Sequence, residues 1–154
     1  MPTAGDPAPD FELPDHHGDR VRLSDLQGRW VVLYFYPRAD TPGCTTEACE
    51  FRDSWDQYRE HDIAIFGISD DPVEDLTSFA EKYDLPFRLL SDESGEVATA
   101  YESYGEKVVF GNRVMGVKRN TYLIDPDGTI ATVFENVSPE GHADEVLEAI
   151  TTTH

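Results

Sequence analysis

Basic residues are scarce in this sequence. Its 154 residues include only 12 Lys and Arg against 31 Asp and Glu, which gives a formal net charge of −19. A surface this acidic repels the phosphates of nucleic acids and anionic lipids, so we expect no nucleic-acid or membrane partner. The same charge opposes association between copies at low salt, and we therefore expect a monomer.

Lysine is especially rare, with three Lys against nine Arg. The carboxylates are interleaved with apolar segments and do not form the long acidic blocks typical of disorder. Carboxylates bind water and cations, and concentrated salt screens their mutual repulsion. The composition therefore favours a folded protein from a halophile.

Long apolar segments are also missing. The longest apolar runs, at 31–36 and 63–68, are far shorter than the roughly 20 residues that a membrane-spanning helix needs. The first residues have neither the basic nor the apolar stretch of a signal peptide. We therefore expect a cytoplasmic protein, and its length, within about 100–200 residues, is that of one domain.

Strand and helix patterns alternate along the chain. Residues 30–36 and 63–68 are apolar on both faces, as expected of central strands that are covered on both sides. Further strands are expected at 87–90, 121–124 and 129–134, helices at 44–61, 73–83, 94–101 and 139–150, and a loop or hairpin at 105–116. This order predicts an α/β fold whose central mixed sheet has helices on both faces.

Metal sites have little support. The Asp125-x-Asp127-Gly128 segment resembles the start of a calcium loop, but the other ligands are missing, so a hairpin turn is favoured. Two cysteines are too few for a zinc-thiolate site, and the five His do not flank them at zinc-finger spacing. We expect neither a metal nor a cofactor.

The two cysteines, Cys44 and Cys49, lie in one short segment. Cys44 follows a strand, Pro37 and a Thr-Pro-Gly turn, at the point where a helical pattern begins. A thiol in the first turn of a helix faces unpaired N–H groups and the positive end of the helix dipole, which stabilise the reactive thiolate. The turn predicts an open approach to the sulfur, and Thr41 supplies a nearby hydroxyl. The alternative is an inert core thiol.

The spacing between the two cysteines restricts how they can bond. Five residues along an ideal helix separate Cα atoms by about 8.6 Å. A disulfide needs less than about 7 Å. A bond between Cys44 and Cys49 therefore requires the first turns of this helix to unwind.

The cysteine segment resembles the active site of the peroxiredoxins, and most closely their Q type, also called bacterioferritin comigratory protein. Its Pro-x-x-x-Thr-x-x-Cys pattern is met by Pro37, Thr41 and Cys44, and C-x4-C marks the Q type. Arg38 and Tyr104 depart from it, since relatives often have Lys and Trp there. Further matches lie at 8–11, 67–69, 90–92, 104–107 and 116–125, so the resemblance covers essentially the whole chain.

The resemblance implies a single thioredoxin-like peroxiredoxin domain over residues 1–154. It also implies a thiol-dependent peroxidase that reduces hydrogen peroxide and organic hydroperoxides. Cys44 corresponds to the peroxidatic cysteine, which forms a sulfenic acid. Cys49 corresponds to the resolving cysteine, and a thioredoxin-like dithiol re-reduces the disulfide.

The resemblance assigns roles to four further residues. Arg119 corresponds to the active-site arginine, which stabilises the thiolate and polarises the peroxide. Thr41 would bond the peroxide and the thiolate, and Pro37 would shield the sulfenate. Glu47 is expected to orient Arg119; the alternative is an ordinary solvated carboxylate on the helix.

Two other functions are compatible with this fold: a dithiol–disulfide carrier, and a holdase chaperone whose thiol is inert. Carriers use C-x-x-C, whose closer spacing allows a disulfide without unwinding, so the C-x4-C pair disfavours this function. Thiol-dependent consumption of peroxide distinguishes the three.

Overall fold

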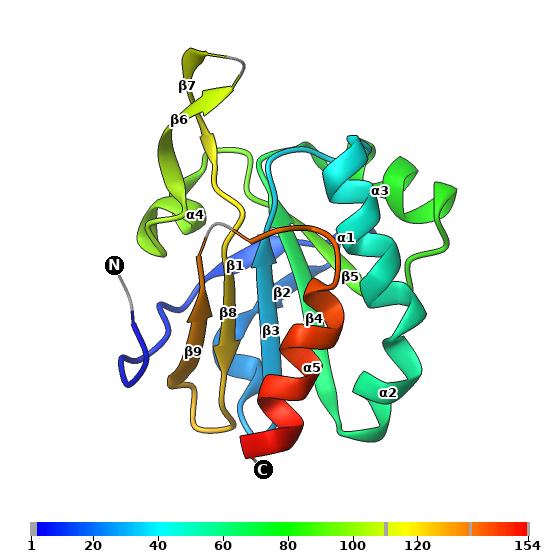
Figure 1. The fold of residues 1–154 in the computed structure, drawn as a ribbon, viewed down its shortest axis with the longest axis vertical. Helices are drawn as coiled ribbons and strands as arrows, with labels where there is room; N and C mark the ends of the chain where they lie inside the picture. Colours follow the sequence, from blue (N-terminus) through cyan, green and yellow to red (C-terminus); the bar gives the residue numbers. More distant parts are fainter. Residues whose placement is uncertain (1–2, 110, 136, 154) are drawn as a thin grey trace.

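The centre of the fold is a five-stranded mixed sheet (Figure 1). The computed structural model describes residues 3–109, 111–135 and 137–153. The strand order is β5-β4-β3-β8-β9, where β3, β4 and β5 are parallel and β8 and β9 are antiparallel. The strands are β3 (Trp30–Phe35), β4 (Ile63–Ser69), β5 (Arg88–Ser91), β8 (Thr121–Ile124) and β9 (Ile130–Phe134). The predicted mixed sheet is confirmed.

Both faces of the sheet are covered. One face packs against α1 (Pro42–Asp53), α2 (Trp55–Glu60), α3 (Val73–Lys82) and α5 (His142–Thr153). The other face is covered by α4 (Glu96–Ala100), a 3-10 turn η1 (Leu23–Leu26), and a hairpin of β1 (Glu12–Pro14) and β2 (Arg20–Arg22). The prediction of helices on both faces is therefore confirmed, although the second face is covered by shorter elements.

Strand β3 shows why a fully apolar strand belongs in the middle of the sheet. Val32 and Tyr34 point into the core beneath α1, whereas Val31, Leu33 and Phe35 point into the opposite core. All five side chains are buried. Because successive side chains of a strand alternate between faces, both faces of β3 need apolar residues.

Two hairpins form, one in the segment where the sequence predicts a loop or hairpin and one at the predicted turn. Strands β6 (Tyr104–Val109) and β7 (Asn112–Val117) pair antiparallel and project from one end of the molecule (Figure 1). Between β8 and β9, the Asp125 carboxylate accepts the backbone N–H groups of Asp127 and Thr129. This is the predicted turn, in which the Asp125 side chain accepts N–H groups that have no backbone acceptor within the turn.

The helix expected at 44–61 is wrong in its bounds. It is two helices, because Ser54 leaves the helical conformation at φ −97° and ψ 3° and separates α1 from α2. It also begins earlier, at Pro42, where the missing N–H of proline costs no helical hydrogen bond. Cys44 is therefore the third residue of α1 and not its first.

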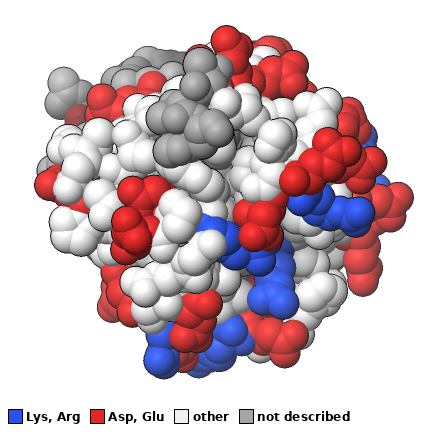
Figure 2. Space-filling view, turned by 90° about the horizontal axis from the view of Figure 1, so that it is seen from below, with Lys and Arg blue, Asp and Glu red and all other residues white. Residues whose placement is uncertain are grey.

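The excess of acidic side chains is distributed over the surface. Figure 2 shows acidic residues spread over one face, with the basic residues lying beside them. Ion pairs include Arg22 with Glu12, Arg29 with Asp62, and Lys82 with Asp40. In the described part of the chain, no helix is both long and apolar enough to cross a membrane.

Candidate active site around Cys44

The loop between β3 and α1 is fixed by the carboxylate of Asp71, which follows the end of β4. The backbone N–H of Ala39 donates to Asp71 Oδ2 over 2.7 Å, and the Ser69 hydroxyl donates to the same oxygen over 2.8 Å. Pro37 is half-buried where β3 ends. Asp71 thus anchors the cysteine loop to Ser69 at the end of β4.

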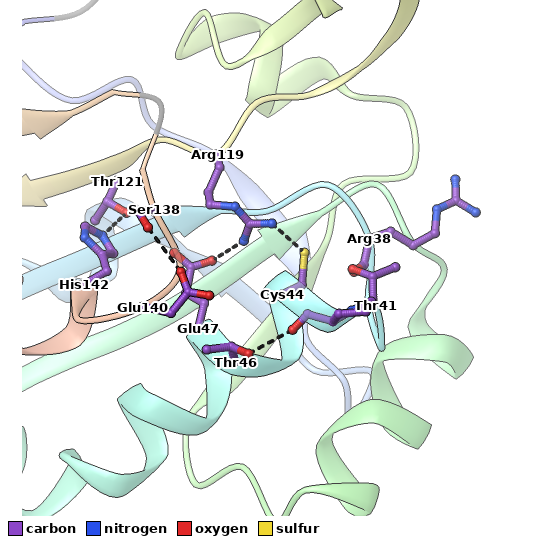
Figure 3. Close-up of polar contacts among 11 residues, drawn as sticks. Arg38, Thr41, Cys44, Thr46, Glu47, Arg119, Thr121, Ser138, Glu140 and His142 are labelled. Carbon is purple, nitrogen blue, oxygen red and sulfur yellow. Dashed lines mark hydrogen bonds and ion pairs between the residues drawn. The ribbon is translucent and has the colours of Figure 1, made fainter. Parts of the chain in front are cut away.

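Cys44 lies in the first turn of α1 and is 1% exposed. Arg119, between β7 and β8, donates from Nη2 to Cys44 Sγ over 3.3 Å (Figure 3). A Cβ atom on Gly43 would lie 3.1 Å from Arg119 Nη2 and 3.3 Å from Pro139 Cγ. Glycine thus lets these two side chains close over the helix start, and the predicted open approach to the sulfur is wrong.

Glu47 holds the other end of the guanidinium group. Arg119 Nη1 donates to Glu47 Oε1 over 2.8 Å, and Glu47 is completely buried (Figure 3). Its second oxygen, Oε2, has no hydrogen-bond partner among the described residues. Burial raises the pKa of Glu47 to about 7, although Arg119 opposes the shift. The Arg119 guanidinium group therefore contacts both the Cys44 sulfur and the buried Glu47 carboxyl group.

Arg119 stays charged in this half-buried position. Burial lowers its pKa, but the Cys44 sulfur and the Glu47 carboxyl more than compensate, so that its pKa is raised overall. The guanidinium group has planar donors that can bond two acceptors at once. The contact between Arg119 and Glu47 agrees with the orienting role expected for Glu47.

Thr41 precedes α1, and its hydroxyl lies outside the contact between Arg119 and Cys44. Its carbonyl accepts the N–H of Thr45 over 2.8 Å, which begins the helix. Its hydroxyl donates to the Arg38 carbonyl over 2.8 Å (Figure 3). The Thr41 hydroxyl thus donates its hydrogen bond within the loop, while its oxygen can still accept a hydrogen bond from another group.

Cys49 lies on the same unbroken helix as Cys44, and both thiols are free. Its side chain is half-buried, and this burial raises the pKa of the Cys49 thiol, which nearby Arg52 only partly offsets. The structure is therefore the helical dithiol form. Among the described residues, no cluster of three or more His, Cys, Asp and Glu side chains is placed to hold a metal ion.

Comparison with known proteins agrees with this geometry. The AhpC/TSA family model matches residues 4–133. Peroxiredoxin Bcp of Bacillus subtilis is 44% identical over 95% of this chain and 93% of its own length. The chain is a peroxiredoxin of the AhpC/TSA family. It is thus a thiol-dependent peroxidase. Peroxiredoxin Bcp of Escherichia coli is also similar, at 46% identity over 94% of this chain and 92% of its own.

Solved structures confirm the thioredoxin-like fold of this peroxiredoxin. A cysteine-to-serine mutant of Xylella fastidiosa PrxQ superposes with a TM-score of 0.94 at 32% identity, covering 99% of this chain and 98% of that chain. Peroxidoxin BcpB of Mycobacterium tuberculosis superposes with a TM-score of 0.89 at 40% identity, covering 100% and 99%. The resemblance to the Q type is therefore confirmed.

Proposed function

We propose that Cys44 is the peroxidatic cysteine of this peroxiredoxin and that Cys49 resolves it. The observation that carries the proposal is the 3.3 Å contact between Arg119 Nη2 and Cys44 Sγ in the first turn of α1. A guanidinium group and a helix N-terminus both stabilise an anion, so the thiolate is favoured where the peroxide is attacked.

In the first step, the Cys44 thiolate attacks one oxygen of the peroxide. A sulfur–oxygen bond forms and the O–O bond breaks. The departing oxygen leaves as water or an alcohol with the peroxide proton, and Cys44 becomes a sulfenate. Arg119 stabilises the negative charge as it passes from sulfur to oxygen. The Thr41 oxygen accepts the peroxide O–H, and Pro37 restricts access of water to the sulfenate.

In the second step, the sulfenate takes up a proton from solvent to become a sulfenic acid, α1 unwinds, and the Cys49 thiol meets the Cys44 sulfenic acid. A disulfide forms and water leaves. Burial holds the pKa of Cys49 above its usual range, so this thiol is weakly nucleophilic until the helix opens. A thioredoxin-like dithiol then reduces the disulfide.

Substrate and setting follow from the same chemistry. Hydrogen peroxide and organic hydroperoxides both carry the O–O bond, and alkyl peroxide reduction activity is attributed to the similar Xanthomonas campestris protein. We further propose a monomeric, cytoplasmic protein whose 154 residues form one domain. The charge of −19 opposes self-association and so supports the monomer.

Two serine variants test these roles. Cys44→Ser should lose peroxide turnover with a thioredoxin couple. Cys49→Ser should consume one equivalent of peroxide rapidly and then stop. Full turnover by Cys44→Ser would refute the assignment of Cys44, and sustained thioredoxin-dependent turnover by Cys49→Ser would refute that of Cys49.

A further inference from the structure

A short segment between β9 and α5 lies against the helix that carries both cysteines. This segment, residues 137–141, is called the strap here. The N–H of Val137 donates to the Arg119 carbonyl over 2.8 Å, and the N–H of Gly141 donates to Glu50 Oε1 over 2.7 Å. Between them, Pro139 packs over Gly43. In Figure 1 the strap, in orange, crosses from β9 towards α1.

The two contacts of the strap with α1 enclose the cysteine pair. Gly43 directly precedes Cys44, and Glu50 directly follows Cys49. In an α-helix the N–H of Glu50 bonds the carbonyl of Thr46, so unwinding between the cysteines also releases Glu50. Both contacts therefore require a folded α1.

Glu50 also completes the start of α5. Gly141, at φ +78°, accepts the N–H of Glu145 but has no side chain with which to cap its helix. The Glu50 carboxylate takes the Gly141 N–H instead, and a negative charge at a helix N-terminus is favourable. The bond thus joins α1 to the start of α5.

The beginning of α5 is firmly held by the core. His142 is buried, with Nε2 2.8 Å from the Thr121 hydroxyl of β8, and its ring packs edge-on against Phe134 of β9. The Tyr58 hydroxyl donates to the Ala143 carbonyl over 2.6 Å. Because α5 is fixed in this way, the strap provides a stationary support against which α1 folds.

We propose that Glu50 is a positioning residue for the resolution step, acting through its bond to the strap. By holding α1 folded, it limits how often the Cys44 sulfenic acid meets Cys49. This inference rests on the proposed function of the two cysteines. While α1 stays folded, a second peroxide can oxidise the sulfenic acid to a sulfinic acid. Glu50 therefore controls what fraction of the Cys44 sulfenic acid forms the disulfide and what fraction is overoxidised.

The test compares Glu50→Ala with the wild-type protein after one equivalent of hydrogen peroxide. Samples are quenched at intervals, and disulfide and sulfinic acid are measured by mass spectrometry. Loss of a charge-assisted bond made only in the folded helix should raise the rate of disulfide formation by about threefold to tenfold. The sulfinic fraction at higher peroxide should fall, while the first reaction keeps its rate.

Two further variants separate this role from a general loss of stability. Glu140→Ala removes the same charge from the strap, where Glu140 accepts a bond from the Ser138 hydroxyl and from no other described residue, and should resolve at the wild-type rate. Glu50→Gln keeps an acceptor oxygen and should restore most of the slow resolution. If Glu50→Ala does not fold, Pro139→Ala tests the same support at the Gly43 end.

The outcomes distinguish the two proposals. An unchanged or slower disulfide rate in Glu50→Ala, or an equal acceleration in Glu140→Ala, would overturn the role of Glu50 alone. If the wild-type protein formed no bond between Cys44 and Cys49 at all, the proposed function would fail as well.

Discussion

The buried carboxyl of Glu47 gives the protein a specific dependence of stability on pH. Its only described partner is Arg119, and its second oxygen is unpaired. We consider the substitution Glu47→Gln, which keeps the shape and an acceptor oxygen for Arg119 but cannot ionise.

The size of the effect follows from the shift in pKa. Burial raises the pKa of Glu47 from 4.5 to about 7 in the folded protein. Between these values the unfolded chain has released the proton and the folded chain still holds it, so stability is lost as pH rises through this window. At about 1.4 kcal/mol per pKa unit, ionisation of Glu47 should cost roughly 2–4 kcal/mol by pH 8.

The assay is urea unfolding at several pH values between 4.5 and 8.5, at fixed salt. The parent and Glu47→Gln are compared, each in a Cys44→Ser background, so that neither protein carries the Cys44 thiol. The free energy of unfolding of the parent should fall relative to Glu47→Gln as pH rises. Exposed Glu140, changed to Gln, is the control and should show no such trend. A constant difference between parent and Glu47→Gln would refute the reasoning.

Three other predictions concern the site, its support and its charge. Arg119→Met should slow the first peroxide reaction by roughly 10- to 100-fold in stopped-flow assays, whereas Arg29→Met, at a surface ion pair, should not. Gly67→Ala places a Cβ 2.7 Å from the Tyr34 ring and should lower stability by about 1–3 kcal/mol in thermal unfolding; an unchanged melting temperature would contradict the packing. Raising salt to about 1 M, where the Debye length is roughly 3 Å, should increase the rate at which Cys44 reacts with peroxide. Salt screens the distant carboxylates but not Arg119, which contacts the sulfur; a flat or falling rate would count against this.

Local patterns were sufficient to predict most of the fold. The apolar runs at 30–36 and 63–68 form adjacent parallel strands because a strand with two apolar faces is stable only between two covering layers. The break at Ser54 was missed, since apolar residues on both sides of it continue the helical period. Periodicity reports which residues face the core and is insensitive to one non-helical residue.

The contacts that complete the site join residues far apart in the sequence. Arg119 follows Cys44 by 75 residues, and Gly141 follows Glu50 by 91. Resemblance to a known motif pointed to Arg119, but no local pattern signals that Glu50 bonds a backbone N–H of the strap. The burial of Cys44 was missed for the same reason, because Arg119 and Pro139 come over Gly43 from other elements.

The central claim, that Cys44 reacts with peroxide and Cys49 resolves it within the same chain, has one most direct test. Cleavage after Arg38 and Arg52 releases a single peptide, residues 39–52, that contains both cysteines. After one equivalent of hydrogen peroxide, this peptide should be lighter by two hydrogen atoms and should not be linked to a second chain. In Cys49→Ser the same peptide should instead carry a sulfenic acid at Cys44. An unchanged wild-type peptide, or one linked between chains, would contradict the claim.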